Sequence, residues 1–227
     1  MPVDPKQFWE DKLLAWEQGR YGQPGRPPGP LEWIANRSST SLRYRLAVTP
    51  ELLRPFLAGR RVVELGCGSG LLAARLIAYG AASYLGIDIA ESAIRKARDT
   101  HAGDARIAFA VGSVAELSPL PADLVISLGL FDWLDDEEIA NVFAKSGSAD
   151  FLHAIAERRP GLQQWLHRAY VVLAYGHRTD GYRPRYLTCG HIEALAKAVV
   201  PRRLHVFRHR QLSFGALISS LPIGEAA

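Results

Sequence analysis

Three glycines stand at alternate positions directly after a short apolar stretch: Gly66, Gly68 and Gly70 in the segment VVELGCGSG, residues 62–70. Glycine suits a backbone that must adopt positive φ or let a ligand approach within contact distance. Asp88 ends the next apolar stretch, eighteen residues after Gly70. A carboxylate at the end of that stretch is placed to accept hydrogen bonds from both hydroxyls of a ribose. The pattern therefore predicts a nucleoside site.

A nicotinamide dinucleotide site is the main alternative for such a turn, but it favours the longer spacing G-x-G-x-x-G. Glu64 also stands two residues before the first glycine. Its carboxylate would repel a pyrophosphate and attract a cationic amino-acid tail. The residues favour a nucleoside that carries positive charge, and a purely structural turn is the remaining alternative.

The elements around this turn follow an alternating order. Short apolar stretches at 61–65, 83–88, 106–111, 123–128 and 150–157 predict strands, and helical patterns at 71–79, 91–101 and 135–145 separate most of them. Such alternation is typical of βαβ units, with helices on both faces of a parallel sheet.

The last two β-prone stretches, 204–207 and 211–219, lie too close in sequence for a helical crossover and should pair antiparallel. Asp135, with Glu138 three residues later, predicts a capping box at the start of the helix 135–145. The sequence predicts an α/β fold: a Rossmann-like doubly wound sheet, mostly parallel, with one antiparallel terminal strand.

The N-terminal part has a different pattern. Helical spacing of apolar residues predicts a helix over 5–20, and the segment QPGRPPGP (23–30) separates it from the next element. A further helical stretch covers 41–57, in which Pro50 is predicted to open a new helix after Thr49 as N-cap. Four large apolar side chains in this part need burial: Trp9, Trp16, Tyr21 and Trp33. We predict an N-terminal helical lid, residues 1–58, over a nucleoside-binding domain of residues 59–227. A dimer contact or simple core packing would also bury these side chains.

The segments VVELGCGSG and LGIDIAESAIRKAR resemble motifs I and II of the class I S-adenosylmethionine-dependent methyltransferases, and the resemblance covers about residues 60–157. It implies S-adenosylmethionine as cofactor, with the backbone of Gly66, Cys67 and Gly68 bordering the methionine portion and Glu64 near its ammonium group. Asp88 would hold the ribose, and Ile89 would pack on the adenine.

One segment departs from the pattern of this family. Many relatives show Gly-Asp after the third strand, and this chain has Gly112-Ser113-Val114. The Ser113 hydroxyl and the Val114 amide would still meet the adenine, without the charge. By the same resemblance the end of the fourth strand, at Leu128, would border the methyl group and its acceptor.

Asp132 is the first candidate for a catalytic group, as a general base or a substrate contact, although it could equally cap the following turn. Tyr175 and Tyr182 are the other two candidates. They belong to a cluster with Tyr170, His177 and Tyr186, interleaved with arginines, that could line a substrate mouth and stabilise a sulfonium by cation–π attraction. A packing helix followed by a solvated loop is the alternative.

The resemblance implies methyl transfer to an oxygen or nitrogen of a small molecule, of the kind found in bacterial secondary metabolism. An alternative use of the same cofactor is its own cyclisation to azetidine-2-carboxylate, as in the azetidine-2-carboxylate synthases of this fold, with release of methylthioadenosine. A protein that keeps the fold only as a scaffold is a third hypothesis.

The composition limits the kinds of partner that the sequence predicts. The chain has 227 residues and a net charge of +4, but residues 151–227 alone hold eleven Lys/Arg and four Asp/Glu. Those arginines could receive an acidic acceptor or carrier; without a recognition module they do not predict nucleic-acid binding. No apolar run reaches the ~20 residues of a membrane helix. Two cysteines without zinc-ligand spacing predict no metal site and a reducing cytoplasm.

Overall fold

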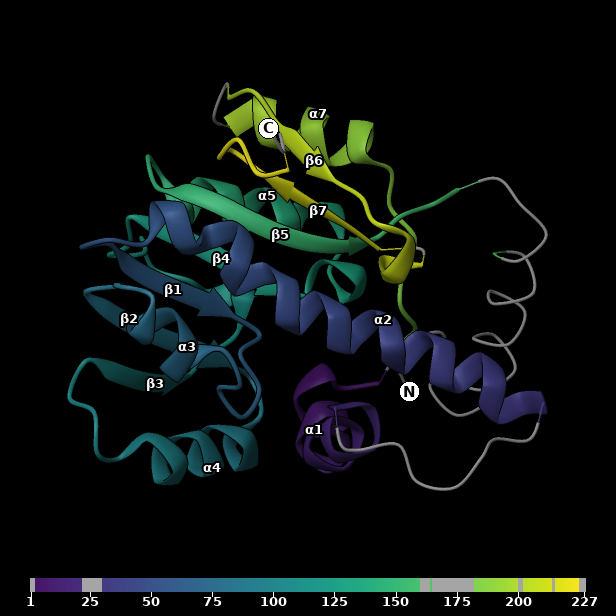
Figure 1. Ribbon diagram of the computed structural model, residues 1–227, viewed down its shortest axis with the longest axis horizontal. Coiled ribbons are helices and arrows are strands. Elements are labelled where there is room, and N and C mark those ends of the chain that lie inside the picture. The colour runs from purple at the N-terminus through teal and green to yellow at the C-terminus, as the bar shows by residue number, and fades with distance from the viewer. Residues whose placement is uncertain are drawn as a thin grey trace.

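The computed structural model describes residues 3–21, 30–159, 164, 182–199, 202–213 and 215–224. Within this part of the chain, seven strands form one sheet in the order β3-β2-β1-β4-β5-β7-β6. The neighbours from β3 to β5 pair in parallel, and β7 lies antiparallel between β5 and β6. The predicted Rossmann-like doubly wound sheet, with its antiparallel terminal strand, is confirmed (Figure 1).

The helices are α1 (Pro5–Tyr21), α2 (Pro30–Leu53), α3 (Ala73–Ala78), α4 (Glu91–His101), α5 (Asp136–Ser146) and α7 (Cys189–Val199). The strands are β1 (Arg61–Leu65), β2 (Ser83–Asp88), β3 (Ile107–Val111), β4 (Leu124–Leu128), β5 (Asp150–Ala156), β6 (His205–Phe207) and β7 (Gly215–Ser219). Four short 3-10 helices complete the set: η1 (Arg54–Phe56), η2 (Val114–Glu116), η3 (Phe131–Trp133) and η4 (Arg210–Leu212).

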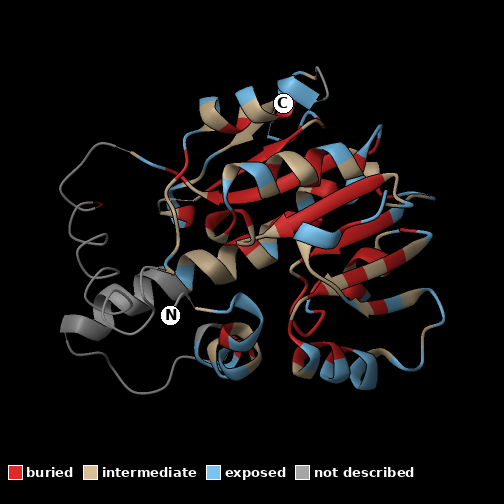
Figure 2. Ribbon diagram, turned by 180° about the vertical axis from the view of Figure 1, so that it is seen from behind, coloured by how far each residue is buried: buried red, intermediate tan, exposed pale blue. Residues whose placement is uncertain are grey.

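Two apolar layers enclose the sheet because successive side chains of a strand point to opposite faces. Val62 packs in a cluster with residues of the C-terminal part of α2, of α3 and of α4, whereas Val63 packs with residues of α5 and α7. Burial of each such side chain contributes roughly 1.5–3 kcal/mol. Figure 2 shows the strands as the buried centre, with the exposed residues on the outer sides of the helices.

Two predicted elements differ from the structure. Pro50 lies inside α2 and opens no new helix, and the Thr49 hydroxyl donates to the Arg45 carbonyl at 2.9 Å instead of capping a helix. Packing of Leu53 in the core holds this part of α2 in place. The stretch predicted as a strand over 211–219 begins with η4 and becomes a strand only at Gly215. The capping box of Asp135 and Glu138 is present.

Helix α1 lies at the edge of the sheet where the parallel strands end (Figure 1). The Glu10 carboxylate accepts the Ser92 N–H, in the first turn of α4, with 3.1 Å to each oxygen. A carboxylate is favoured there because the first turn of a helix has unpaired N–H groups. This contact fixes α1 beside the end of β2.

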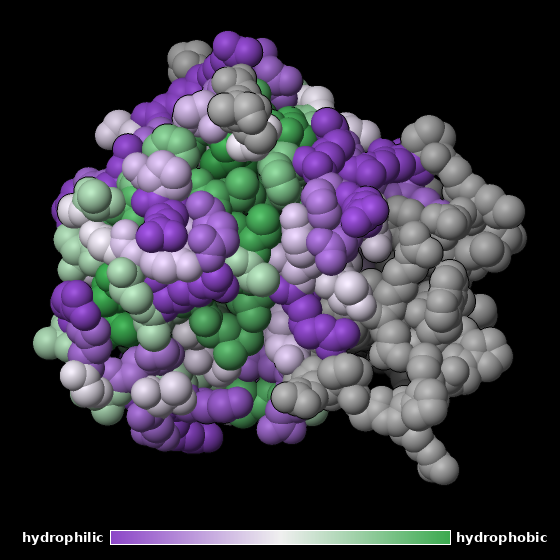
Figure 3. All heavy atoms as spheres, viewed as in Figure 1, coloured by the Kyte–Doolittle hydropathy of each residue, from purple (hydrophilic) through white to green (hydrophobic). Residues whose placement is uncertain are grey.

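The described surface is mixed in character. Figure 3 shows hydrophilic residues over much of one face, with hydrophobic residues between them. In the described part of the chain, no helix combines the length and apolarity that crossing a bilayer requires.

Candidate active site

A cavity of about 660 Å³ opens at the carboxyl ends of the parallel strands, between the sheet and helices α1 and α2. Ligands of open α/β sheets bind at this edge, where the strand order reverses. All nine residues predicted to bind the cofactor line the cavity: Glu64, Gly66, Cys67, Gly68, Asp88, Ile89, Ser113, Val114 and Leu128. Asp132 and Tyr182 line it too, whereas Tyr175, Tyr170 and His177 lie outside the described residues.

Asp88 organises the glycine turn. Its Oδ2 accepts the Gly68 N–H at 2.8 Å, and its Oδ1 accepts the Ala90 N–H at 2.9 Å. Burial raises the pKa of Asp88, and the backbone N–H groups act against that rise. Since each carboxylate oxygen has more than one acceptor position, Asp88 can hold the turn and still accept bonds from ligand hydroxyls.

Glu64 is buried below the turn and accepts a hydrogen bond from the Tyr84 hydroxyl. Burial raises the pKa of Glu64 to about 8, and the negative charges of Asp88 and Glu17 add to the rise. A cation bound beside Glu64 would reverse this effect. The neighbouring Cys67 thiol is buried, its pKa is raised, and it approaches the Gly68 carbonyl at 3.6 Å, so it is a packing group rather than a nucleophile.

Glu17 reaches the turn from α1, which sequence reasoning missed. Its Oε1 accepts the Ser69 N–H at 2.9 Å, while its Oε2 is buried with no partner among the described residues. Gly68 has φ of +53°, and a Cβ there would overlap Glu17 Oε1. Glycine is therefore needed at this position both for its backbone angle and for the approach of α1. The seven-residue spacing of Glu10 and Glu17, two turns of one helix face, is the signal that could have revealed it.

Asp132 lies in η3, directly after β4. Its Oδ1 accepts the Ala156 N–H at 2.6 Å, so its side chain reaches the end of β5 instead of capping the following turn. Its Oδ2 makes no hydrogen bond within the described part of the chain. Burial raises the pKa of Asp132 to about 6, although the Ala156 N–H and the charge of Arg45 favour the ionised form.

Arg45 is a second residue that no motif indicated. It is 7% exposed, lines the cavity from α2, and its Nε has no partner among the described residues. A Cβ at Gly129, where φ is +87°, would lie 2.7 Å from an Arg45 nitrogen, so the guanidinium group packs against the backbone after β4. Its charge acts on Asp132 and Tyr21.

An aromatic cluster forms another part of the wall. The Trp9 ring meets the Trp133 ring edge to face at 4.8 Å, and the Trp133 and Tyr182 rings lie 5.1 Å apart. Trp9 Nε1 donates to the Tyr182 hydroxyl at 3.1 Å. Phe8 packs on Tyr182 at 5.1 Å from the outer side. We call Trp9, Trp133 and Tyr182 the aromatic wall.

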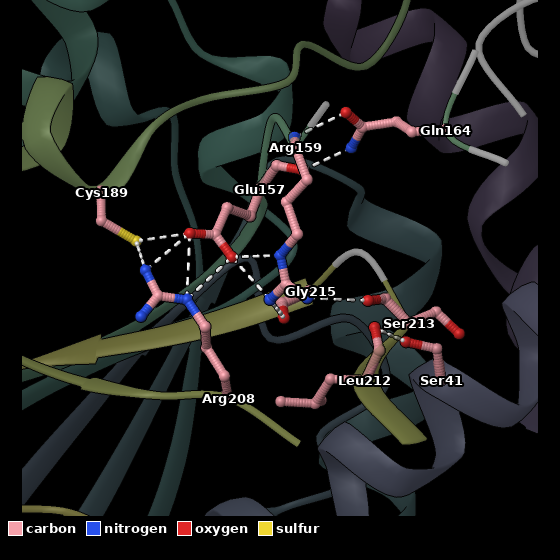
Figure 4. A network of polar contacts seen from close by, with 9 residues as sticks. All are labelled: Ser41, Glu157, Arg159, Gln164, Cys189, Arg208, Leu212, Ser213 and Gly215. Atoms are coloured by element: carbon pink, nitrogen blue, oxygen red, sulfur yellow. Dashed lines mark hydrogen bonds and ion pairs between the residues drawn. The ribbon is translucent and has the colours of Figure 1, made fainter. Parts of the chain in front are cut away.

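Two arginines of the basic C-terminal part, Arg159 and Arg208, form ion pairs near the cavity (Figure 4). Arg159 and Arg208 both bind the Glu157 carboxylate. Burial tends to raise the pKa of Glu157, but the hydrogen bonds from these arginines outweigh burial and lower the pKa to about 2. Cys189 donates to the same carboxylate at 3.2 Å. Arg159 also reaches the Ser213 carbonyl, beside the cavity, at 3.4 Å. These arginines connect β5, α7 and the β6–β7 end of the sheet.

Comparisons with known proteins agree with this geometry. Residues 62–149 match the model of the methyltransferase domain family. Among curated proteins, the ubiquinone biosynthesis O-methyltransferase of Neisseria meningitidis serogroup A is 35% identical over 86 residues, which cover 35% of this chain and 36% of that protein. The ribosomal protein L11 methyltransferase of Erwinia tasmaniensis is 49% identical over 43 residues, 19% of this chain and 15% of that protein. The similarity thus spans well under half of these relatives.

The fold extends further than the sequence similarity. The magnesium protoporphyrin IX methyltransferase of Synechocystis PCC 6803, solved with bound SAH, is similar in structure, with a TM-score of 0.69 and 17% identity over 94% of this chain and 96% of that one. Residues 62–149 thus match a methyltransferase domain, and the whole fold is that of this structural neighbour. These findings agree with the superfamily and the cofactor that the motifs predict.

Proposed function

We propose that this protein transfers the methyl group of S-adenosylmethionine to a nitrogen or oxygen of a small molecule. The observation that carries the proposal is the convergence of Glu64, the glycine turn, Asp88 and Asp132 on one cavity. The first three suit the amino-acid and ribose parts of the cofactor, and Asp132 suits the acceptor. The bound cofactor supplies an electrophilic methyl group, so the protein's main task is to orient the nucleophile in line with it.

The charge of the cavity supports a cationic ligand. Its described lining holds six carboxylates, on Asp4, Glu17, Glu64, Asp88, Asp132 and Glu138, against the single guanidinium of Arg45. S-adenosylmethionine carries a sulfonium and an ammonium group, which such a lining attracts. Arg45 is the described cation that could pair with the carboxylate of its methionine part.

The individual cofactor contacts are also part of the proposal. Asp88 accepts the ribose hydroxyls, Glu64 lies by the ammonium group, and Ile89, Ser113 and Val114 surround the adenine. Ser113 Oγ already accepts the Ala115 N–H at a long 3.3 Å, so it can turn toward the adenine amino group at small cost. Leu128 borders the methyl group.

Helix α1 acts as the lid over this site. Its Glu17 carboxylate accepts the Ser69 N–H in the glycine turn, and its Glu10 carboxylate accepts the Ser92 N–H at the start of α4. Its Trp9 and Trp16 side chains line the cavity. A helix in this position excludes water from the transfer and must move for the cofactor to exchange.

The test is incubation of the purified protein with methyl-labelled S-adenosylmethionine, with and without a panel of small oxygen and nitrogen acceptors. Labelled acceptor together with S-adenosylhomocysteine is the expected product pair. Methylthioadenosine in the acceptor-free sample would instead establish cyclisation of the cofactor. Cofactor that stays bound and unchanged in every sample would contradict the proposal and favour a scaffold.

A further inference from the structure

The part of the cavity beside Asp132 combines aromatic faces with carboxylates. Trp133 follows Asp132 directly in η3, and its ring meets those of Trp9 and Tyr182. The aromatic wall is braced on two sides: by the hydrogen bond from Trp9 to Tyr182, and by the Arg185 N–H, which donates to the Asp132 carbonyl at 2.6 Å. The wall therefore has a fixed place relative to the Asp132 carboxylate.

A second carboxylate lies near the same wall. Glu138 lines the cavity, and its negative charge acts on the Tyr182 hydroxyl. Arg45, which packs on the backbone at Gly129, is the only Lys or Arg in the described lining. The neighbouring Arg185 does not add charge here, because its guanidinium pairs with Asp136 at 2.6 Å and with the Leu134 carbonyl.

Aromatic faces with nearby carboxylates are the groups that recognise an organic cation. An anionic acceptor would meet Asp132 and Glu138 without a compensating charge other than Arg45. Arg159 and Arg208 of the C-terminal part offer little to an acid at this point, since both are already paired with Glu157.

From this arrangement we propose that the methyl acceptor is an amine, bound as its ammonium ion between the aromatic wall and Asp132. This inference rests on the proposed function and narrows it from nitrogen or oxygen to nitrogen. The Oδ2 of Asp132, which makes no hydrogen bond to the described residues, takes one proton from the ammonium. The freed nitrogen lone pair then forms the N–C bond as the electrons of the C–S bond pass to sulfur, and the product is again an ammonium ion beside a neutral thioether.

Binding of matched probes tests the proposal apart from catalysis. 2-Phenylethylamine, 2-phenylethanol and 3-phenylpropanoate share one ring and differ in the charge of the polar end. Each is titrated by calorimetry into the protein saturated with S-adenosylhomocysteine at pH 7.5. We expect the amine to bind at least tenfold more tightly than the alcohol or the carboxylate. In separate samples that contain methyl-labelled S-adenosylmethionine in place of S-adenosylhomocysteine, we expect the label on the amine alone.

Two variants locate the site. Trp133→Leu removes an aromatic face and Asp132→Asn removes a charge, and each should abolish the tenfold preference for the amine while S-adenosylhomocysteine still binds. Tyr79→Leu, at a half-buried residue that directly follows α3 and is absent from the cavity lining, is the matched control and should keep the preference. Should Trp133→Leu fail to fold, Asp132→Asn alone decides.

Several outcomes overturn the amine proposal without touching the proposed function. These are equal affinity for the three probes, tighter binding of the carboxylate, no binding of the amine, or an amine preference that survives in Asp132→Asn. Methylthioadenosine formed without added amine would place the nucleophile on the cofactor itself and overturn a separate acceptor. If the unaltered protein does not bind S-adenosylhomocysteine, that result instead refutes the proposed function.

Discussion

Among the carboxyl groups around the glycine turn, that of Glu64 has the most strongly shifted pKa, and its surroundings explain why. It is fully enclosed, has two further carboxylates nearby, and receives one hydrogen bond from Tyr84. Its pKa of about 8 means that the group carries a proton at neutral pH in the ligand-free protein. A bound ammonium or sulfonium favours the ionised form, so the cofactor and this proton compete.

The first prediction concerns that proton. Binding of S-adenosylmethionine at pH 7 should release a proton from Glu64, and affinity should rise with pH up to about 8 because less proton must be displaced. Calorimetric titrations in two buffers with different ionisation enthalpies measure the release. The matched variant Glu64→Gln should lose this contribution, and an unchanged proton count in the variant would refute the assignment.

At the scale of elements, helix α1, which is the proposed lid, contacts the cofactor site through Glu17. The buried Oε2 of this side chain has no partner among the described residues, and the negative charge of Glu17 raises the pKa of both Glu64 and Asp88. The ligand-free protein therefore holds an unfavourable concentration of negative charge that a cationic ligand relieves. Stability and binding should respond to Glu17 in opposite directions.

The second prediction tests this opposition with Glu17→Gln, which keeps the size of the side chain. The ligand-free variant should unfold at the same or a higher temperature, since the repulsion is gone. Its affinity for S-adenosylmethionine should fall about tenfold, or about 1.4 kcal/mol. Thermal unfolding with and without ligand measures both effects. Asp11→Asn, an exposed site on α1, is the control, and a variant that binds as tightly as the unaltered protein would disprove the role of Glu17.

The elements also show how far sequence patterns reach. The parallel strands, the capping box of Asp135 and the position of Asp88 depend on local periodicity and turn chemistry, and they were predicted correctly. Glu17 and Arg45 act through the path that α1 and α2 take across the sheet, which no local pattern encodes. Pro50 was misjudged because packing of α2 against the core outweighs its helix-breaking tendency.

At the scale of the whole molecule, one buried histidine couples the core to pH. His153 of β5 is fully buried, stacks on Phe131 at 4.2 Å and on Phe151 at 5.4 Å, and shares a 2.9 Å hydrogen bond with Ser127. Its Nε2 has no partner among the described residues. Burial lowers the pKa of His153 to about 3, so the folded protein keeps this ring neutral.

The third prediction follows from this linkage. In the unfolded chain the histidine titrates near 6.5, so between pH 6.5 and 3 only the unfolded state takes up the proton. As the pH is lowered through this window, protonation of His153 in the unfolded chain alone should lower the free energy of unfolding by roughly 1.4 kcal/mol for each pH unit. Urea unfolding from pH 7 to 4 measures it. Ser127→Ala with His153→Phe should flatten the profile relative to Ser127→Ala alone, and parallel profiles would contradict the assignment.

The claim on which the account depends is that Asp88 and the glycine turn hold S-adenosylmethionine. Calorimetric titration of the cofactor into the unaltered protein and into Asp88→Ala tests it most directly, with Asp104→Ala, an exposed carboxylate, as control and thermal unfolding to verify that each variant is folded. We expect one bound cofactor per chain and an affinity at least tenfold lower in Asp88→Ala, with an unchanged affinity in Asp104→Ala. Equal affinity in a folded Asp88→Ala protein would contradict it.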